Sequence, residues 1–260
     1  MESVSNLRPT TPLTARVIRT QRPRQLNLIL ISPAELDPRS MRAVLIGRRA
    51  VHVRQVHRAR VGDHLRVGML DGAVGQGTVV ELSGDRVVLE IELRATPPQD
   101  AGMHLVLALP RPKVLGRLLR DATTLGIKRL TLVNAARVEK SYWQNHRLAP
   151  EWMRDQAVLG LEQARDTLMP RIDVRRRFRP FVEDELSQAQ GFKLVLHPTA
   201  TEACPRASNQ YLTLAVGPEG GFIPFELELL ANAGFSPLTL GPRVLRVETV
   251  IGVLVGRLRG

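Results

Sequence analysis

Two short apolar segments near the carboxyl end of the chain each run into a loop of glycine and proline and then into a predicted helix. The first is Leu212–Phe222, which contains Val-Gly-Pro-Glu-Gly-Gly, and the second is Leu240–Thr249, which begins Leu-Gly-Pro-Arg-Val-Leu-Arg. Glycine lets a ligand approach the backbone closely, and proline fixes the direction of the amides and carbonyls on the rim. A single loop of this kind is common in ordinary strand-to-helix turns. Two of them close together in sequence predict a binding cleft at the carboxyl ends of parallel strands.

Beyond the segment Pro97–Asp100, which has the composition of a linker, apolar runs alternate with helical stretches. This alternation predicts an α/β domain with a parallel sheet over residues 101–260. The expected strands are nearly continuous in apolar residues, as in strands that are covered on both faces. We expect strands at residues 104–109, 129–134, 192–196, 211–216 and 237–240, and helices at residues 113–125, 150–167, 224–233 and 247–258.

The part of the chain before the linker has a different pattern. Residues 26–96 contain short alternating runs separated by the turn signals Asp71-Gly72 and Ser83-Gly84-Asp85, which predict closely spaced hairpins and a small β-barrel. Strands are expected at residues 27–31, 63–70, 73–81 and 86–93, with a short helix at residues 50–58. Residues 1–25 carry five arginines and no apolar periodicity, and we expect a disordered basic arm there. A transit peptide and a wrongly assigned start codon are the alternatives for this arm.

The composition limits the class of protein and of partner. Lysine and arginine number 37 against 25 acidic residues, a net charge of +12, and only four of the basic residues are lysine. A genome rich in G and C accounts for the preference for arginine but not for the net excess, so we expect a polyanionic partner such as RNA. The lack of an apolar run of membrane length, the single Cys204 and the absence of metal-ligand spacing predict a soluble cytoplasmic protein without a metal.

These motifs resemble a known family. Gly217-Pro-Glu-Gly-Gly221, together with Leu240-Gly-Pro-Arg-Val-Leu-Arg246 and Glu248-Thr249, resembles the signature of the SPOUT superfamily of RNA methyltransferases. Within it the chain is most similar to the bacterial 16S ribosomal RNA uracil-1498 N3-methyltransferase family, which Leu196-His197-Pro198 and Glu162-Gln163 also fit. The resemblance extends from about residue 26 to the carboxyl end. It implies a trefoil knot in the α/β domain, a PUA-like RNA-binding barrel, a homodimer, S-adenosylmethionine as cofactor and 16S rRNA of the 30S subunit as partner.

The resemblance also implies the cofactor site. The expected contacts to S-adenosylmethionine come from three strand ends and their loops, largely through backbone groups. They are Leu196, His197 and Pro198, then Gly217, Pro218, Gly220 and Gly221, and finally Leu240, Gly241, Leu245 and Arg246.

Methylation at N3 of uracil requires loss of a proton and stabilisation of the negative charge that spreads onto the ring oxygens. Arg246 is the candidate cation for that charge. Glu219 and Glu248 are candidates to accept the proton or to orient Arg246. Both acids also stand at predicted helix starts, where a carboxylate is favourable without any catalytic role. Arg246 as a plain phosphate or carboxylate partner is the alternative for the arginine.

Exposed arginines are the candidate RNA contacts. In the predicted barrel they are Arg42, Arg49, Arg54 and Arg58, and in the α/β domain they are Arg111, Arg175 and Arg176. A run of charges is also typical of a solvated connection, so RNA contact and simple exposure both stay open for the last two. The chain departs from the family at Ala164-Arg165-Asp166, Thr124 and Val247, where RNA or a partner subunit would be met. A related enzyme acting on another RNA such as tRNA, and a catalytically silent RNA-binding or assembly factor, are the alternative functions.

Overall fold

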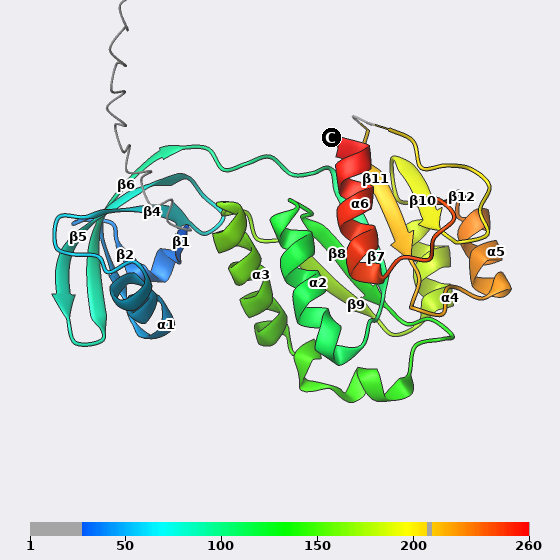
Figure 1. Ribbon diagram of the computed structural model, residues 1–260, viewed down its shortest axis with the longest axis horizontal. Coiled ribbons are helices and arrows are strands. Elements are labelled where there is room, and N and C mark those ends of the chain that lie inside the picture. The colour runs from blue at the N-terminus through cyan, green and yellow to red at the C-terminus, as the bar shows by residue number, and fades with distance from the viewer. Residues whose placement is uncertain (1–27, 207–209, 260) are drawn as a thin grey trace, which may run out of the picture.

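The computed structural model describes residues 28–206 and 210–259, so the predicted arm at residues 1–25 lies outside the described residues. The chain forms two six-stranded sheets joined by an extended segment (Figure 1). None of the helices within these two ranges is both long and apolar enough to span a membrane.

The first sheet has the strand order β1-β4-β5-β6-β3-β2. β1 pairs in parallel with β4, and the other neighbours are antiparallel. Both predicted turns join hairpin strands, and Asp71 and Gly84 adopt left-handed φ values of 57° and 51° there. The strands are β1 Ile29–Ile31, β2 Leu36–Asp37, β3 Arg42–Leu45, β4 His64–Met69, β5 Val74–Ser83 and β6 Arg86–Ala95.

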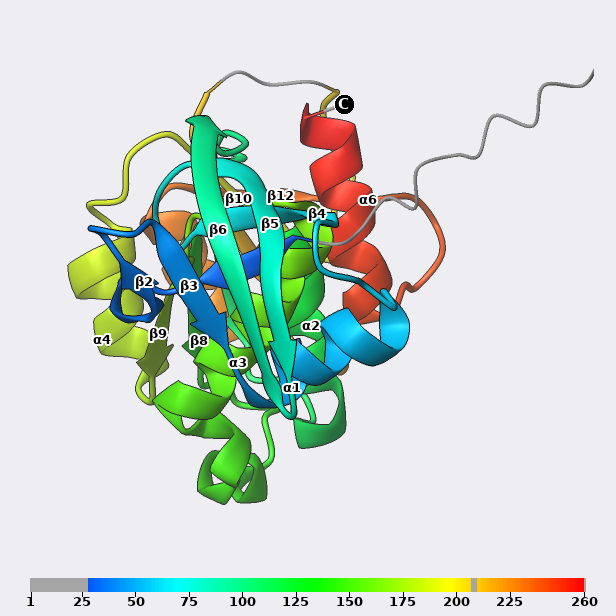
Figure 2. The same ribbon diagram turned by 90° about the vertical axis from the view of Figure 1, so that its left-hand side faces the viewer.

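This sheet curls around its own core, and Figure 2 shows β3, β5 and β6 nearest the viewer. Ile31, Leu45 and Val67 are fully buried inside it. In place of the predicted helix at residues 50–58, α1 covers Gly47–Val51 and a π-helical segment continues over His52–Val56. A 3-10 turn, Pro33–Glu35, precedes β2. The structure therefore has a curled sheet where the sequence predicts a barrel.

The second sheet has the order β12-β10-β11-β7-β8-β9, and every neighbouring pair is parallel. Helices α2, α3 and α6 cover one face, and α4 and α5 cover the other (Figures 1 and 2). The parallel α/β prediction is thus confirmed. The strands are β7 Met103–Ala108, β8 Arg129–Val133, β9 Arg171–Arg175, β10 Phe192–Leu196, β11 Leu212–Val216 and β12 Phe235–Leu238. The helices are α2 Pro112–Thr124, α3 Pro150–Ala164, α4 Phe178–Pro180, α5 Pro224–Asn232 and α6 Val247–Arg259, with 3-10 turns at Lys140–Gln144 and His146–Leu148 and a π-helical segment at Phe181–Leu186.

The predicted elements of this sheet are present, and two differences have a physical cause. Helix α3 ends at Ala164 instead of residue 167, because Arg165 adopts a left-handed conformation with φ 58°. β12 covers Phe235–Leu238 instead of residues 237–240. It contains Pro237, which lacks an N–H donor and is tolerated because β12 is an edge strand.

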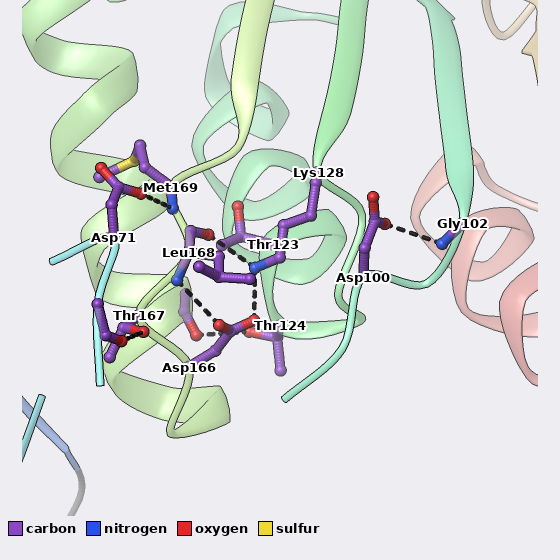
Figure 3. Close-up of polar contacts among 12 residues, drawn as sticks. Asp71, Asp100, Gly102, Thr123, Thr124, Lys128, Asp166, Thr167, Leu168 and Met169 are labelled. Atoms are coloured by element: carbon purple, nitrogen blue, oxygen red, sulfur yellow. Dashed lines mark hydrogen bonds and ion pairs between the residues drawn. The ribbon is translucent and has the colours of Figure 1, made fainter. Parts of the chain in front are cut away.

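The two sheets meet at the turn between α3 and β9 (Figure 3). On one side, Lys128 Nζ binds the carboxylate of Asp166 and donates to the Leu168 carbonyl at 2.7 Å. On the other side, the hairpin turn of the first sheet holds the same segment, since Asp71 Oδ1 accepts from Met169 N at 2.7 Å. The Thr167 hydroxyl donates to the Gly72 carbonyl. These contacts fix the first sheet against the α/β domain.

The junction also has an apolar part. Leu28, Leu30 and Leu161 form a buried cluster that joins the first sheet to α3. A Cβ atom on Gly68 would lie 2.4 Å from Thr167 Cγ2, so β4 packs directly against the turn. Close packing of this kind leaves little room for the two parts to move independently.

Candidate active site

The three strands β10, β11 and β12 end at one edge of the parallel sheet, and their loops enclose a pocket of about 510 Å³. Leu196, Val216 and Leu240 contribute apolar walls, and backbone groups of the glycine loops form the rim. The structure brings together in this pocket ten of the eleven predicted cofactor residues and all three predicted catalytic residues. They are Leu196, His197, Pro198, Gly217, Pro218, Gly221, Leu240, Gly241, Leu245 and Arg246, with Glu219 and Glu248.

The loop after β11 is a tight turn whose shape depends on glycine. Gly221 N donates to the Pro218 carbonyl at 2.7 Å, and Gly221 has a φ of 74°. A Cβ atom on Gly217 would lie 3.1 Å from Phe222 N, so a larger residue would displace the backbone of the turn. Proline and glycine here shape a fixed backbone rim, as the sequence predicts.

The loop after β12 is held by the segment that follows β10. Thr239 N donates to the Glu202 carbonyl at 2.8 Å, and Cys204 N donates to the Thr239 carbonyl at 3.0 Å. The Thr239 hydroxyl accepts from Gly241 N at 3.2 Å. This bonding leaves the side chains of Leu240 and Leu245 to line the pocket.

Charged side chains cluster at the mouth of the pocket. Arg111 Nε lies 3.5 Å from Glu219 Oε1, and both side chains are largely exposed. Arg243, Arg246 and Glu248 also line the pocket. Within residues 28–206 and 210–259, neither an ion pair nor a side-chain hydrogen bond occupies the Arg246 guanidinium. An exposed cation on the pocket wall is therefore available to an anionic ligand.

Gly220, the remaining predicted cofactor residue, points its carbonyl away to Arg137, whose guanidinium donates to it. Arg137 lies in the loop after β8, and a buried carboxylate holds that loop. Glu226, at the start of α5, is 3% exposed; its Oε1 accepts from Ala136 N at 2.7 Å and its Oε2 from Ile223 N at 3.0 Å. Sequence reasoning missed Arg137 and Glu226. The position of Glu226 three residues after Ile223, in the first turn of an apolar helix, is the one local signal for it.

The predicted RNA-binding arginines occupy different environments. Arg42, Arg54, Arg58 and Arg111 are exposed. Arg49 instead lies half-buried in the first sheet, where its guanidinium binds the Glu35 carboxylate and donates to the Leu30 carbonyl at 2.7 Å. The hydrogen bond that its guanidinium donates to Glu35 raises the pKa of Arg49. Arg49 is thus a structural partner within the sheet.

Arg175 and Arg176 also differ from one another. Arg175 forms a two-pronged pair with Glu185, with N–O distances of 2.6 and 2.9 Å, and this hydrogen-bonded pairing raises the pKa of Arg175. Arg176 is exposed and lies over the ring of Trp143, with Cζ 5.2 Å from the ring centre. The Arg176 guanidinium also donates to the Trp143 carbonyl at 3.3 Å, and among the described residues it has no carboxylate partner.

Comparison with known proteins agrees with this geometry. Residues 97–259 match the model of the RNA methyltransferase domain family. The chain belongs to this family. It is 32% identical to ribosomal RNA small subunit methyltransferase E of Treponema pallidum over 212 residues, which cover 77% of this chain and 78% of that protein. It is also 32% identical to the enzyme of the same name from Mycobacterium bovis, over 82% of this chain and 84% of the relative.

The fold of the methyltransferase is shared with solved structures. Ribosomal RNA small subunit methyltransferase E from Neisseria gonorrhoeae, bound to S-adenosyl methionine, superposes with a TM-score of 0.70 at 20% identity. The superposition covers 88% of this chain and 96% of that one. The similarity therefore includes both sheets and not the methyltransferase domain alone.

Proposed function

We propose that this enzyme methylates N3 of a uridine in 16S rRNA of the small ribosomal subunit, in the cytoplasm, with S-adenosylmethionine as methyl donor. The observation that carries the proposal is the pocket at the carboxyl ends of β10, β11 and β12, which unites the glycine loops with a free Arg246. Family membership and the names of the relatives support the class of reaction and of substrate.

The pocket residues fit S-adenosylmethionine. Its volume of about 510 Å³ lies in the usual range for small-ligand sites, and its walls are apolar where an adenine ring would lie. Gly217, Gly221 and Gly241 let a ligand reach the backbone on two sides, and nothing lies within 4 Å of a Cβ atom placed on Gly241. When bound, the cofactor supplies an electrophilic methyl group.

The chain's own residues supply charge and position. Arg246 neutralises the negative charge that develops on a uracil oxygen as the N3 proton leaves, and a fixed cation of this kind typically contributes about 10²–10³ in rate. Glu248 lies two residues from Arg246 on the same wall and accepts the N3 proton at a carboxylate oxygen or orients the arginine. Glu219 is paired with Arg111 at the mouth, which favours a positioning role for that pair.

The proposal includes the architecture implied by the resemblance. The domains are residues 26–96, a PUA-like RNA-binding unit, and residues 101–260, a SPOUT domain with a trefoil knot. Thr239 pairs with the segment at Glu202 and Cys204. Arg257 Nε donates to the Cys204 carbonyl at 2.6 Å. These contacts support a chain that is threaded through the loop after β10.

A homodimer is part of the same proposal. Val253 on α6 is 42% exposed, and Val244 beside the pocket is 82% exposed. Nothing lies within 4 Å of a Cβ atom placed on Gly252 or Gly256, so the outer side of α6 is open to close approach by a second subunit. Apolar side chains exposed next to a pocket support an interface there.

RNA binding is assigned to exposed arginines on both sheets. Arg42, Arg54 and Arg58 lie on the first sheet, and Arg111 and Arg176 lie near the carboxyl edge of the second. Arg49 and Arg175 each pair with a carboxylate, that of Glu35 and that of Glu185, and these pairs stabilise the surface that carries the exposed arginines. Exposed arginines pair with phosphates and raise the salt dependence of binding.

Labelled S-adenosylmethionine, offered with unmodified 30S subunits, free 16S rRNA or tRNA, tests the proposal when the methylated nucleosides are identified by mass spectrometry. N3-methyluridine in 30S subunits or 16S rRNA is the expected product. Transfer to tRNA alone would establish the related enzyme with another substrate. Cofactor-independent RNA binding without any transfer would establish a silent assembly factor.

A further inference from the structure

A second depression, separate from the active-site pocket, runs along β9, the edge strand of the parallel sheet. It has a volume of about 380 Å³. Met153, Ile172 and Val174 form its apolar floor, and the exposed Arg154 and Arg176 lie on its rim. None of the described residues that line this groove is acidic. The groove therefore combines apolar surface with uncompensated positive charge.

The two ends of the groove lie at different functional parts of the molecule. Met169, at one end, is held by Asp71 of the first sheet through the 2.7 Å bond at the junction (Figure 3). Arg176, at the other end, follows the last residue of β9. Because all strands of this sheet are parallel, Arg176 lies at the same edge as the active-site pocket. The groove thus leads from the first sheet to the catalytic edge.

Aromatic and basic residues continue from the groove toward the pocket. Trp143, on which Arg176 lies, donates from Nε1 to Asn134 Oδ1 at 2.8 Å and is fixed against the end of β8. Three residues after Asn134, Arg137 donates to the carbonyl of Gly220 in the glycine loop. The carboxyl edge between the groove and the pocket therefore carries a fixed indole ring and two guanidinium groups.

We propose that this groove binds the RNA strand next to the target nucleotide, with bases against the apolar floor and phosphates at Arg154 and Arg176. Single-stranded RNA presents flat bases that stack on apolar and aromatic groups and a backbone that pairs with arginine. The length of β9, about 16 Å at 3.3 Å per residue, accommodates a short stretch of such a strand. The proposal rests on the proposed function and names a part of the substrate that the catalytic pocket does not hold.

A photo-crosslinking experiment tests the occupant directly. The variant Arg154→p-benzoylphenylalanine is irradiated with unmethylated 30S subunits, and the crosslinked nucleotide is mapped. Arg206→p-benzoylphenylalanine, at an exposed arginine in the segment after β10 and so on the far side of the sheet from β9, is the matched control. A crosslink a few nucleotides from the methylated uridine, absent from the control, is expected. A crosslink to a second copy of the protein, a distant RNA crosslink or a result equal to the control would overturn the proposal.

Salt-dependent binding gives a second readout. Arg154→Ala combined with Arg176→Ala should raise the KM for 30S subunits and lower the salt slope by about 0.7 for each phosphate that no longer pairs with an arginine. kcat and cofactor affinity should stay at the wild-type values, and Arg206→Ala should change nothing. If the double variant kept the wild-type KM and salt slope, the proposal that the groove binds RNA would be overturned, and the proposed function would stand. Failure of the wild-type protein to methylate any RNA would overturn the proposed function, while an RNA crosslink at position 154 that is absent from the control would still show that RNA binds in the groove.

Discussion

The buried carboxylate of Glu226 is expected to determine both the stability of the α/β domain and the shape of the cofactor pocket. It accepts one hydrogen bond from the start of its own helix, at Ile223 N, and one from Ala136 N, which lies 90 residues away in sequence. Ala136 precedes Arg137, the residue that holds the Gly220 carbonyl of the glycine loop. Removal of Glu226 therefore loosens the loop after β8 and the start of α5, which both adjoin the glycine loop of the pocket.

The magnitude follows from the two donors that Glu226→Ala leaves unpaired. A buried donor without a partner costs about 1–3 kcal/mol. Both bonds are partly buried, so we take about 1–2 kcal/mol for each and expect the free energy of unfolding to fall by about 2–4 kcal/mol. Glu226→Gln keeps one acceptor oxygen and should lose about half of that. If about 1.4 kcal/mol of the loss falls on the glycine loop, the Kd for S-adenosylmethionine rises about tenfold.

Urea unfolding followed by circular dichroism measures the stability, and isothermal titration calorimetry measures the Kd for S-adenosylmethionine. Glu228→Ala is the matched control, because Glu228 is an exposed carboxylate two residues further along the same helix. Its removal should leave both quantities within the error of the wild type. Equal unfolding midpoints for Glu226→Ala and Glu228→Ala would refute the reasoning.

Three further substitutions have defined outcomes. Arg246→Ala should lower kcat for methyl transfer by about 10²–10³ while RNA affinity stays near normal, as single-turnover assays and filter binding would show. Burial lowers the pKa of His104 to about 4. The unfolded chain binds this proton near pH 6.5 and the native state does not, so the free energy of unfolding should fall by about 3 kcal/mol from pH 6.5 to 4. In urea titrations across this window, His104→Gln should flatten the pH dependence; an unchanged slope would exclude the histidine as its source. Lys128→Met leaves the buried Asp166 without its cation and should cost about 3–5 kcal/mol in the same unfolding assay, whereas a loss below 1 kcal/mol would contradict the buried pair.

The glycine loops and the parallel sheet could be predicted because their signals are local. A run such as Leu212–Val216 is apolar at nearly every position, and the glycine and proline that follow it fix a turn by their own stereochemistry. The position of Gly217 against Phe222 N follows from the same few residues. The two glycine loops that border the pocket could therefore be predicted from the sequence.

Two kinds of feature could not be predicted in this way. β9 has the sequence Arg-Ile-Asp-Val-Arg, in which three of five residues are charged, because an edge strand needs fewer apolar positions than a central one. The contact between Arg137 and Gly220 joins residues that are 83 positions apart in the sequence, and no local sequence pattern predicts it. The sequence favours RNA contact for Arg49 because arginines are usually exposed, but its partner Glu35 holds it inside the sheet.

The most direct test of the central claim compares the wild-type enzyme with Arg246→Ala on unmodified 30S subunits and labelled S-adenosylmethionine. Nucleosides are separated and identified by mass spectrometry, and the position of the label is mapped on 16S rRNA. The account predicts N3-methyluridine at a single position with the wild type and a yield lower by about 10²–10³ at equal times with the variant. A different methylated nucleoside, or full activity of Arg246→Ala, would contradict it.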